Sequence, residues 1–288
     1  MRAVIFGGTG MLGRALAAEG RRRDQALLAL SHAEANLDDG ERLRYWTREF
    51  RPEVVFNCAA FTRVDDCEVR RAVAFAANAT GVGKALAAAR EVDARLVQVS
   101  SDYVFDGRAT APYAEEAAAA PLSVYGESKL AGEAEALADP RSLVVRASWL
   151  FGPGGPNFVH TMLGLFERRR RDGTPVRVVD DQVGCPTYTP YLARALWELA
   201  QRGVRGLVHY RNREPVSWHG FAAEIALAGG LGPGFVEAIS TADFPRPARR
   251  PAYSVLDVGR FEALCGRRVE SWSAGLEDYL ERIRTRRN

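Results

Sequence analysis

Cysteine is scarce in this chain, because only four of its 288 residues are Cys and no two of them form a C-x-x-C pair. Each lies in an apolar or mixed stretch, which is typical of small core residues. They are Cys58, Cys67, Cys185 and Cys265. The sequence therefore argues against structural zinc and disulfides, and we expect no bound metal ion.

Long apolar runs are also missing. No run approaches the roughly 20 residues that span a bilayer. The first residues enter an apolar strand without a basic region, a long apolar stretch or a cleavage site before it. With 47% hydrophobic and 26% charged residues, the composition is that of an ordinary globular protein. We expect no membrane contact and a location in the cytoplasm.

A strong net charge is absent too, since the formal value is +3. Arginine is dense at 20–24 and 167–173, but both clusters follow apolar-periodic segments, where cations complement a helix C-terminus. Aromatic residues do not alternate with these arginines, as they do on many nucleic-acid-binding surfaces. We therefore expect no nucleic-acid partner.

Short apolar runs alternate with longer periodic segments in the first half of the chain. The runs predicted as buried strands are 3–8, 26–30, 54–60, 95–101 and 142–148. The segments predicted as helices are 11–22, 40–50, 69–90 and 124–138. Such alternation predicts right-handed β-α-β units. The expected fold class is α/β, a Rossmann-type doubly wound parallel sheet with helices on both faces.

The alternation stops near residue 150, where a loop rich in Gly and Pro begins. A helix and a strand later return to the sheet, and the last quarter of the chain is predicted as helices joined by a proline-rich loop. We expect a dinucleotide-binding domain from 1–150 plus about 176–213. A smaller, mainly helical substrate-binding lobe should comprise about 151–175 plus 214–288.

A glycine-rich turn lies directly between the first predicted strand and the first predicted helix. Gly8, Gly10 and Gly13 satisfy G-x-G-x-x-G, and Gly7 adds an overlapping spacing. Glycine allows the tight turn and close backbone approach, and the helix N-terminus offers free N–H groups to a pyrophosphate. The turn predicts a dinucleotide cofactor.

The second predicted strand ends at Ser31 and His32, where an acidic residue would accept the ribose hydroxyls of NAD. A small neutral residue followed by a possible cation leaves room for a 2′-phosphate. We expect NADP(H) to be favoured, with NAD(H) possible.

Polar residues follow three predicted strands, in "NCAAFT", "SSDYVFDG" and "RASWLFG". In a parallel sheet, ligands bind beyond these strand ends. Tyr125 and Lys129 lie one turn apart on a helix that packs beside the same crevice. Ser101, Tyr125 and Lys129 can thus converge on one carbonyl group, with the ammonium expected to lower the pKa of the phenol. That arrangement suits proton donation during hydride transfer to a ketone.

Seven motifs follow one another along the chain: "GGTGMLG", "NCAAFTRVDDCE", "SSDYVFDG", "YGESKLAGE", "RASWLFGPGGPNF", "DDQVGCPT" and "RPAYSVLD". In this order they resemble the dTDP-4-dehydrorhamnose reductase family, a branch of the extended short-chain dehydrogenases/reductases. The resemblance covers essentially the whole chain. It implies NAD(P)H-dependent reduction of the C4 ketone of dTDP-4-dehydro-6-deoxy-L-mannose to dTDP-L-rhamnose.

The resemblance also implies roles for particular residues. The catalytic residues would be Ser101, Tyr125 and Lys129, with Tyr125 as the proton donor. The residues lining the cofactor would be Gly7, Gly10, Met11, Leu12, Gly13, Ser31, His32, Asn36, Leu37, Ala59, Ala60, Phe61, Thr62, Val99, Tyr125 and Lys129. The residues touching the dTDP-sugar would be Ser101, Asp102, Tyr103, Trp149 and Val64.

One departure concerns assembly. Members of the family that join subunits through magnesium carry a glutamate two residues after the last glycine of the turn, and this chain has Ala15 there. We expect a monomer or a metal-independent homodimer.

Two other functions stay open on the sequence. The family resemblance extends to the non-catalytic, NADP-binding β subunit of methionine adenosyltransferase, although the intact Ser, Tyr and Lys favour an enzyme. A sister sugar-nucleotide reductase, epimerase or 4,6-dehydratase is the other alternative. Dehydratases place Asp-Glu after the catalytic hydroxyl, whereas Asp102 and Tyr103 stand here.

Overall fold

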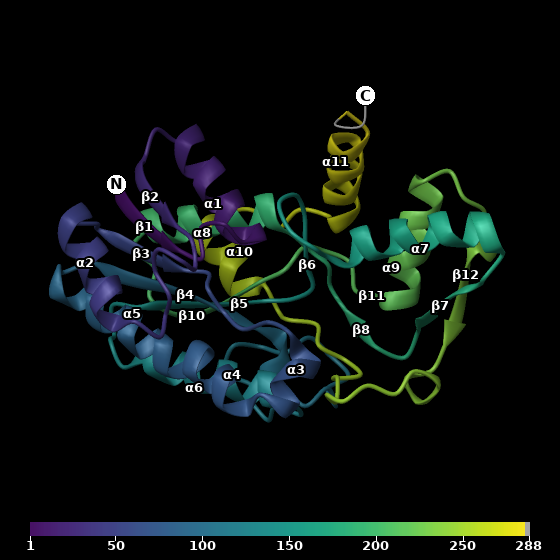
Figure 1. Cartoon of the computed structure of the whole chain (residues 1–288), viewed down its shortest axis with the longest axis horizontal. Coiled ribbons are helices and arrows are strands. Elements are labelled where there is room, and N and C mark those ends of the chain that lie inside the picture. The colour runs from purple at the N-terminus through teal and green to yellow at the C-terminus, as the bar shows by residue number, and fades with distance from the viewer. Residues whose placement is uncertain (286–288) are drawn as a thin grey trace.

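A six-stranded parallel sheet forms the centre of the larger domain (Figure 1). The computed structural model describes residues 1–285, and its strand order is β10-β5-β4-β3-β1-β2. The strands are β1 (Arg2–Phe6), β2 (Ala26–Leu30), β3 (Val54–Asn57), β4 (Arg95–Ser101), β5 (Leu143–Ala147) and β10 (Gly206–Tyr210). The order reverses between β1 and β3, which is the switch point of a Rossmann-type fold. The predicted fold class is confirmed.

Helices cover both faces of the sheet. Along β1, Ala3 and Ile5 face one core, while Val4 and Phe6 face the other, because side chains alternate along a strand. The first core packs under α1 (Met11–Arg22) and α8 (Thr189–Gln201), and the second under α2 (Gly40–Phe50), α5 (Gly81–Glu91) and α6 (Val124–Leu137). Burial on both faces explains why the strands read as continuous apolar runs.

The helix predicted over 69–90 is present as one continuous helix, Arg71–Glu91, made of α4 (Arg71–Phe75), a π-helical turn (Ala76–Thr80) and α5. The short helix α3 (Val64–Val69) precedes it. The stretch Arg71–Glu91 is long and apolar enough to cross a membrane by length and composition, but half of it is buried. It packs against α2, α6 and β4 as a core helix.

The smaller lobe holds short strands and helices to one side of the sheet (Figure 1). Two of its strands, β7 (Val176–Val179) and β12 (Val236–Ile239), pair in parallel. Its other elements are β6 (Leu150–Phe151), α7 (Phe158–Asp172), β8 (Val183–Gly184), β9 (Thr187–Tyr188), β11 (Val216–Ser217), α9 (Trp218–Ala228) and α11 (Trp272–Thr285). The arginine runs fall in the last turns of α1 and α7, as the sequence predicts.

Two predicted domain boundaries need correction. The segment predicted to rejoin the sheet at 176 first forms β7, which pairs with β12 and packs in the core of the lobe. Conversely, α10 (Gly259–Cys265), predicted in the lobe, packs against the sheet core through Phe261 and Cys265. Residues 286–288 of the predicted lobe lie outside the described residues.

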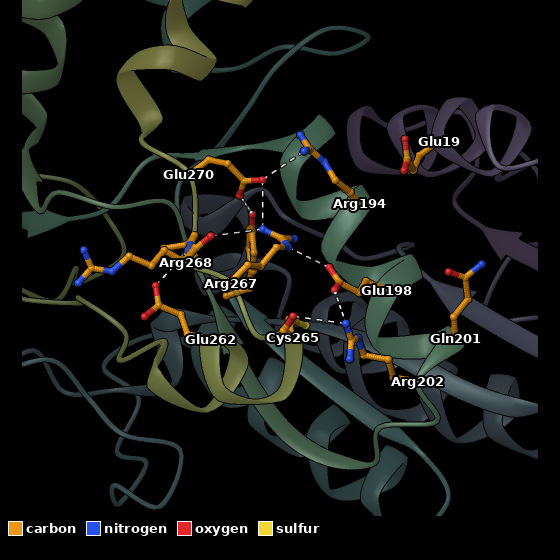
Figure 2. Close-up of polar contacts among 12 residues, drawn as sticks. Glu19, Arg194, Glu198, Gln201, Arg202, Glu262, Cys265, Arg267, Arg268 and Glu270 are labelled. Atoms are coloured by element: carbon orange, nitrogen blue, oxygen red, sulfur yellow. Dashed lines mark hydrogen bonds and ion pairs between the residues drawn. The ribbon is translucent and has the colours of Figure 1, made fainter.

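Polar contacts attach α10 to α8 (Figure 2). Arg267 donates from Nε to Oε2 of Glu198 at 3.0 Å and from Nη1 to Oε1 of Glu270 at 3.2 Å. Arg202 donates to Oε1 of Glu198 at 3.1 Å and to the backbone oxygen of Cys265. The bonds from Arg267 to Glu198 and from Arg202 to Cys265 join segments more than 60 residues apart, which local sequence patterns do not report.

Candidate active site

The phosphate turn has the backbone geometry that a pyrophosphate requires. Gly7 has φ +75°, and a Cβ there would lie 2.7 Å from the backbone nitrogen of Ala59. A Cβ on Gly13 would lie 2.2 Å from the oxygen of Gly7. Gly10 caps α1 without a side-chain acceptor, and the first turn of α1 has no acid. The N–H groups of this helix end therefore remain available to an anion, and the residues fit a dinucleotide.

The adenine-ribose end of the predicted cofactor site contains an acid that the sequence reading missed. Oε2 of Glu34 accepts hydrogen bonds from the N–H of Ser31 at 2.8 Å and from its hydroxyl at 2.7 Å. Arg42 donates from Nε to the backbone oxygen of Glu34 at 3.1 Å, and His32 is exposed. Glu34 lies three residues beyond the strand end, so inspection of that position alone does not find it.

The loop after β3, which carries most of the other predicted cofactor residues, is held by a buried amide. Asn78 accepts from the N–H of Phe61 at 2.8 Å and donates to its oxygen at 3.0 Å. Asn78 lies in the π-helical turn, and π-helical turns are frequent at functional sites. A Cβ on Gly132 of α6 would lie 2.0 Å from the oxygen of Asn78, so this turn packs tightly on the helix that carries Tyr125.

The three predicted catalytic residues meet at the carboxyl end of β4. Ser101 ends β4, and its hydroxyl lies near the phenol of Tyr125. Lys129 is buried one turn further along α6 and donates from Nζ to the oxygen of Val99 at 2.7 Å. Gly126 lets α6 approach closely, since a Cβ there would lie 2.2 Å from the oxygen of Tyr103.

The expected lowering of the phenol's pKa is not what the structure shows. Burial raises the pKa of Tyr125 above its ordinary value, and the hydrogen bond with Ser101 only partly offsets this. Burial lowers the pKa of Lys129 to about 8, against the opposing charge of Glu133. At neutral pH, Tyr125 therefore keeps its proton and Lys129 keeps its charge. A protonated phenol is the form that a proton donor needs.

Asp102 is a buried carboxylate beside this group. Its side chain is 1% exposed, Oδ1 accepts from the hydroxyl of Ser101 at 3.0 Å, and Oδ2 has no hydrogen-bond partner among the described residues. Burial raises the pKa of Asp102 to about 6, although hydrogen bonds from Ser254 and Ser101 oppose the rise. An ionised Asp102 therefore costs stability at neutral pH.

We expect Asp102→Asn to gain stability relative to wild type as the pH rises. The cost of ionisation is absent well below pH 3.8, grows as the pH rises towards 6 and is constant above that. From pH 4 to pH 8, the difference in unfolding free energy should move by about 2.5 kcal/mol in favour of the variant. Urea unfolding at both pH values measures it.

The matched control is Asp106→Asn, at a half-buried carboxylate. Hydrogen bonds from Arg108 and Tyr113 lower the pKa of Asp106, so this substitution should lose relative stability as the pH rises. The same pH trend in both variants would contradict the assignment of the cost to Asp102.

The predicted sugar-contacting residues lie around the same strand ends. The rings of Tyr103 and Tyr125 meet edge to face, with centroids 5.5 Å apart. Trp149 stacks on Trp218 at 3.5 Å and has φ +48°, a strained conformation for a bulky residue. Val64 begins α3 and is half-buried. Trp149 thus connects the end of β5 to the lobe.

A pocket of about 620 Å³ opens in the lobe, and we call it the lobe pocket. Its aromatic walls include Phe158, Trp218 and Phe244. Its cations are Arg177, Arg246, Arg249 and Arg250. Aromatic rings with several guanidinium groups suit a base and a diphosphate. The sequence reading missed these residues; the arginine-rich, proline-rich stretch "FPRPARRP" is the signal that could have indicated them.

Comparison with known proteins agrees with this geometry. The family model described as RmlD substrate binding domain matches residues 1–285. A dTDP-4-dehydrorhamnose reductase of Mycobacterium tuberculosis is 43% identical over 272 residues, which cover 92% of this chain and 87% of that protein.

Two solved structures are also similar over nearly their full lengths. A dTDP-4-dehydrorhamnose reductase from Clostridium acetobutylicum has a TM-score of 0.93 and 35% identity, covering 99% of this chain and 100% of that one. One from Bacillus anthracis, in complex with NADP, has a TM-score of 0.92 and 33% identity, covering 98% and 99%. The sequence motifs, the fold and these relatives lead to one conclusion: the chain belongs to the dTDP-4-dehydrorhamnose reductase family.

Proposed function

We propose that this protein reduces the C4 ketone of dTDP-4-dehydro-6-deoxy-L-mannose to the alcohol of dTDP-L-rhamnose, with NADPH as the favoured reductant. The observation that carries the proposal is the convergence of Ser101 and Tyr125 at the carboxyl end of β4, with Lys129 one turn further along α6. This group lies at the carboxyl end of the parallel strands, the same end as the phosphate turn. Relatives named dTDP-4-dehydrorhamnose reductase support the substrate. The relative from Bacillus anthracis that contains NADP supports the cofactor.

The roles of the residues follow from their chemistry. When bound, NADPH supplies the hydride that reaches C4. Tyr125 donates its proton to the ketone oxygen, and Ser101 donates a hydrogen bond to the same oxygen as negative charge develops on it. Lys129 places a positive charge near the phenolate that Tyr125 becomes, which favours proton release in the transition state.

The lobe pocket is the proposed site of the nucleotide half of the substrate. Its arginines would pair with the diphosphate, and its aromatic side chains would contact the base. Asp102, Tyr103 and Trp149, between this pocket and the catalytic group, would then contact the sugar. We propose that the sheet domain, with α10, binds the dinucleotide. We propose that the lobe, with β7, binds the substrate.

The test is NADPH oxidation with dTDP-4-dehydro-6-deoxy-L-mannose, combined with fluorescence titration of NADPH and NADH. We expect turnover, and tighter binding of NADPH than of NADH. Glu34 lies close to the strand end where a 2′-phosphate would sit, so Glu34→Gln should widen that preference by about fivefold through lost repulsion.

Glu41→Gln, at an exposed acid in the first turn of α2, is the matched control and should leave the preference unchanged. A wild-type preference for NADH would refute the cofactor proposal. Absence of turnover with any 4-keto sugar nucleotide would favour the regulatory-subunit alternative.

We also propose that the protein acts in the cytoplasm as a monomer or metal-independent homodimer. A pocket of about 420 Å³ at Ala15 is lined by Arg14, Arg22 and Arg282 and by the acid Glu19, which pairs with Arg22. Guanidinium groups there would repel a magnesium ion, which supports assembly without one.

A further inference from the structure

A single carboxylate connects the sheet domain to the loop that lines the lobe pocket. Asp65 is the second residue of α3, and the arginine loop (residues 244–251) follows β12 about 180 residues later. Figure 1 shows the chain after β12 returning past α3. The carboxylate is mostly buried, with 18% of the side chain exposed.

Both oxygens of Asp65 are used by the loop. Oδ1 accepts from the N–H of Ala248 at 3.2 Å and from Nη1 of Arg250 at 3.1 Å. Oδ2 accepts from Nε of Arg246 at 3.0 Å and from Nη2 of Arg250 at 3.0 Å. A second bond from Arg246, through Nη2, also reaches Oδ2. The carboxylate therefore organises the loop's backbone and two of its guanidinium groups together.

The pKa of Asp65 is consistent with these hydrogen bonds. Burial opposes ionisation of Asp65, but hydrogen bonds from Arg250, Arg246 and Ala248 lower its pKa to about 2. The carboxylate is thus charged at every pH at which an enzyme of this kind works. Two arginines paired with one carboxylate leave one positive charge in excess at the pocket wall, beside Arg177 and Arg249.

The loop's other polar anchors lie at its two ends. Asp181 accepts from the N–H of Thr241 at 3.0 and 2.8 Å, before the loop begins. Val183 donates to the oxygen of Ala252 at 2.7 Å, after it ends. Asp65 contacts the loop between these anchors. Arg250 extends the connection inward, because it also lies close enough to the phenol of Tyr103 to influence its pKa.

We propose that Asp65 is a positioning residue for the sugar nucleotide, which holds Arg246 and Arg250 in the lobe pocket so that they meet the diphosphate in a fixed arrangement. This inference rests on the proposed function. Removing the charge should release the loop, so each arginine would have to be ordered when the diphosphate binds, at a cost in affinity.

The test compares Asp65→Asn with Asp66→Asn. Asp66 is the next residue of the same helical turn and pairs with Arg63 instead of the loop, so both variants remove the same charge from α3. For Asp65→Asn we expect the KM for the sugar nucleotide and the Kd for dTDP, measured by calorimetry, to rise about tenfold or more. The kcat and the Kd for NADPH should stay within about twofold of wild type. Asp66→Asn should match wild type in all four.

Asp65→Glu is the conservative variant, which keeps the carboxylate and should recover part of the lost dTDP affinity. If Asp65→Asn binds dTDP as wild type does, or if Asp65→Glu loses as much affinity as Asp65→Asn, the proposal is wrong.

Limited trypsin digestion tests the loop without any turnover. Proline follows Arg246 and Arg250, so the bond after Arg249 is the one in the loop that trypsin cuts readily. We expect faster cleavage there in Asp65→Asn, wild-type rates in Asp66→Asn, and protection of wild type by dTDP. Unchanged cleavage in Asp65→Asn would overturn the proposal. Faster cleavage in a protein that does not reduce the sugar nucleotide would instead keep the anchoring role and refute the proposed function.

Discussion

Tyr125→Phe should lower turnover by roughly a hundredfold or more, which is the loss typical of a missing general acid. The substitution keeps the ring and its edge-to-face contact with Tyr103, but it removes the hydroxyl, which lies near Ser101. Because burial raises the pKa of Tyr125, the wild-type phenol carries its proton at neutral pH, and the variant has none to give. The measurement is NADPH oxidation with dTDP-4-dehydro-6-deoxy-L-mannose.

Measuring the Kd for NADPH distinguishes a variant that has lost the catalytic step from one that has lost its folded structure. The Kd for NADPH should change little in Tyr125→Phe, and Ser101→Ala should show a smaller defect in turnover, because one donor to the ketone oxygen remains. Tyr113→Phe is the control, since its hydroxyl bonds Asp106 outside the catalytic group. Wild-type turnover in Tyr125→Phe would rule out the phenol as proton donor.

Lys129→Met should damage both turnover and cofactor binding. Lys129 is one of the predicted cofactor-lining residues, and its ammonium bonds the backbone oxygen of Val99, which is another of them. It is also the cation nearest in sequence to Tyr125 on the same face of α6. We expect turnover to fall by about a hundredfold and the Kd for NADPH to rise by about tenfold. Thermal stability should hold or rise, because a buried charge is removed.

The pH profile gives an independent check on Lys129. Burial lowers the pKa of Lys129 to about 8, so the side chain is charged below that pH and neutral above it. The kcat/KM of wild type should therefore fall as the pH rises through about 8, because this parameter reports the free enzyme. Lys84→Met removes the chain's other lysine, which bonds the oxygen of Asp38 at the surface. It should keep the wild-type profile, and a flat wild-type profile up to pH 10 would contradict the role of Lys129.

The parts of the site that could be predicted from the sequence are those whose geometry depends on a single helical turn or a single strand-to-helix turn. The phosphate turn needs glycine at Gly7 and Gly13 because the backbone itself fills the space of a Cβ. Tyr125 and Lys129 share a face of α6 because residues four apart always do. Sequence patterns alone thus locate the residues proposed for proton donation and phosphate binding, as they do the strands of the sheet.

Other features depended on which distant segments pack together. The helix α10 packs on α8, and β7 pairs with β12 instead of the sheet. The predicted pKa of Tyr125 had the wrong direction, because spacing reports a nearby cation but not the extent of burial. Desolvation by the surrounding protein raises this pKa, and the hydroxyl of Ser101 only partly offsets the rise.

By itself, the sequence determined the α/β alternation, the glycine turn and the spacing of Tyr125 and Lys129, since each depends on backbone geometry over a few residues. Only the tertiary structure decided that Asp65 would meet Arg246 and Arg250, residues about 180 positions away. It also decided that Asp102 would be buried with one oxygen unpaired. Charge pairing and desolvation act between surfaces brought together by long-range packing, and no local pattern records which surfaces those are.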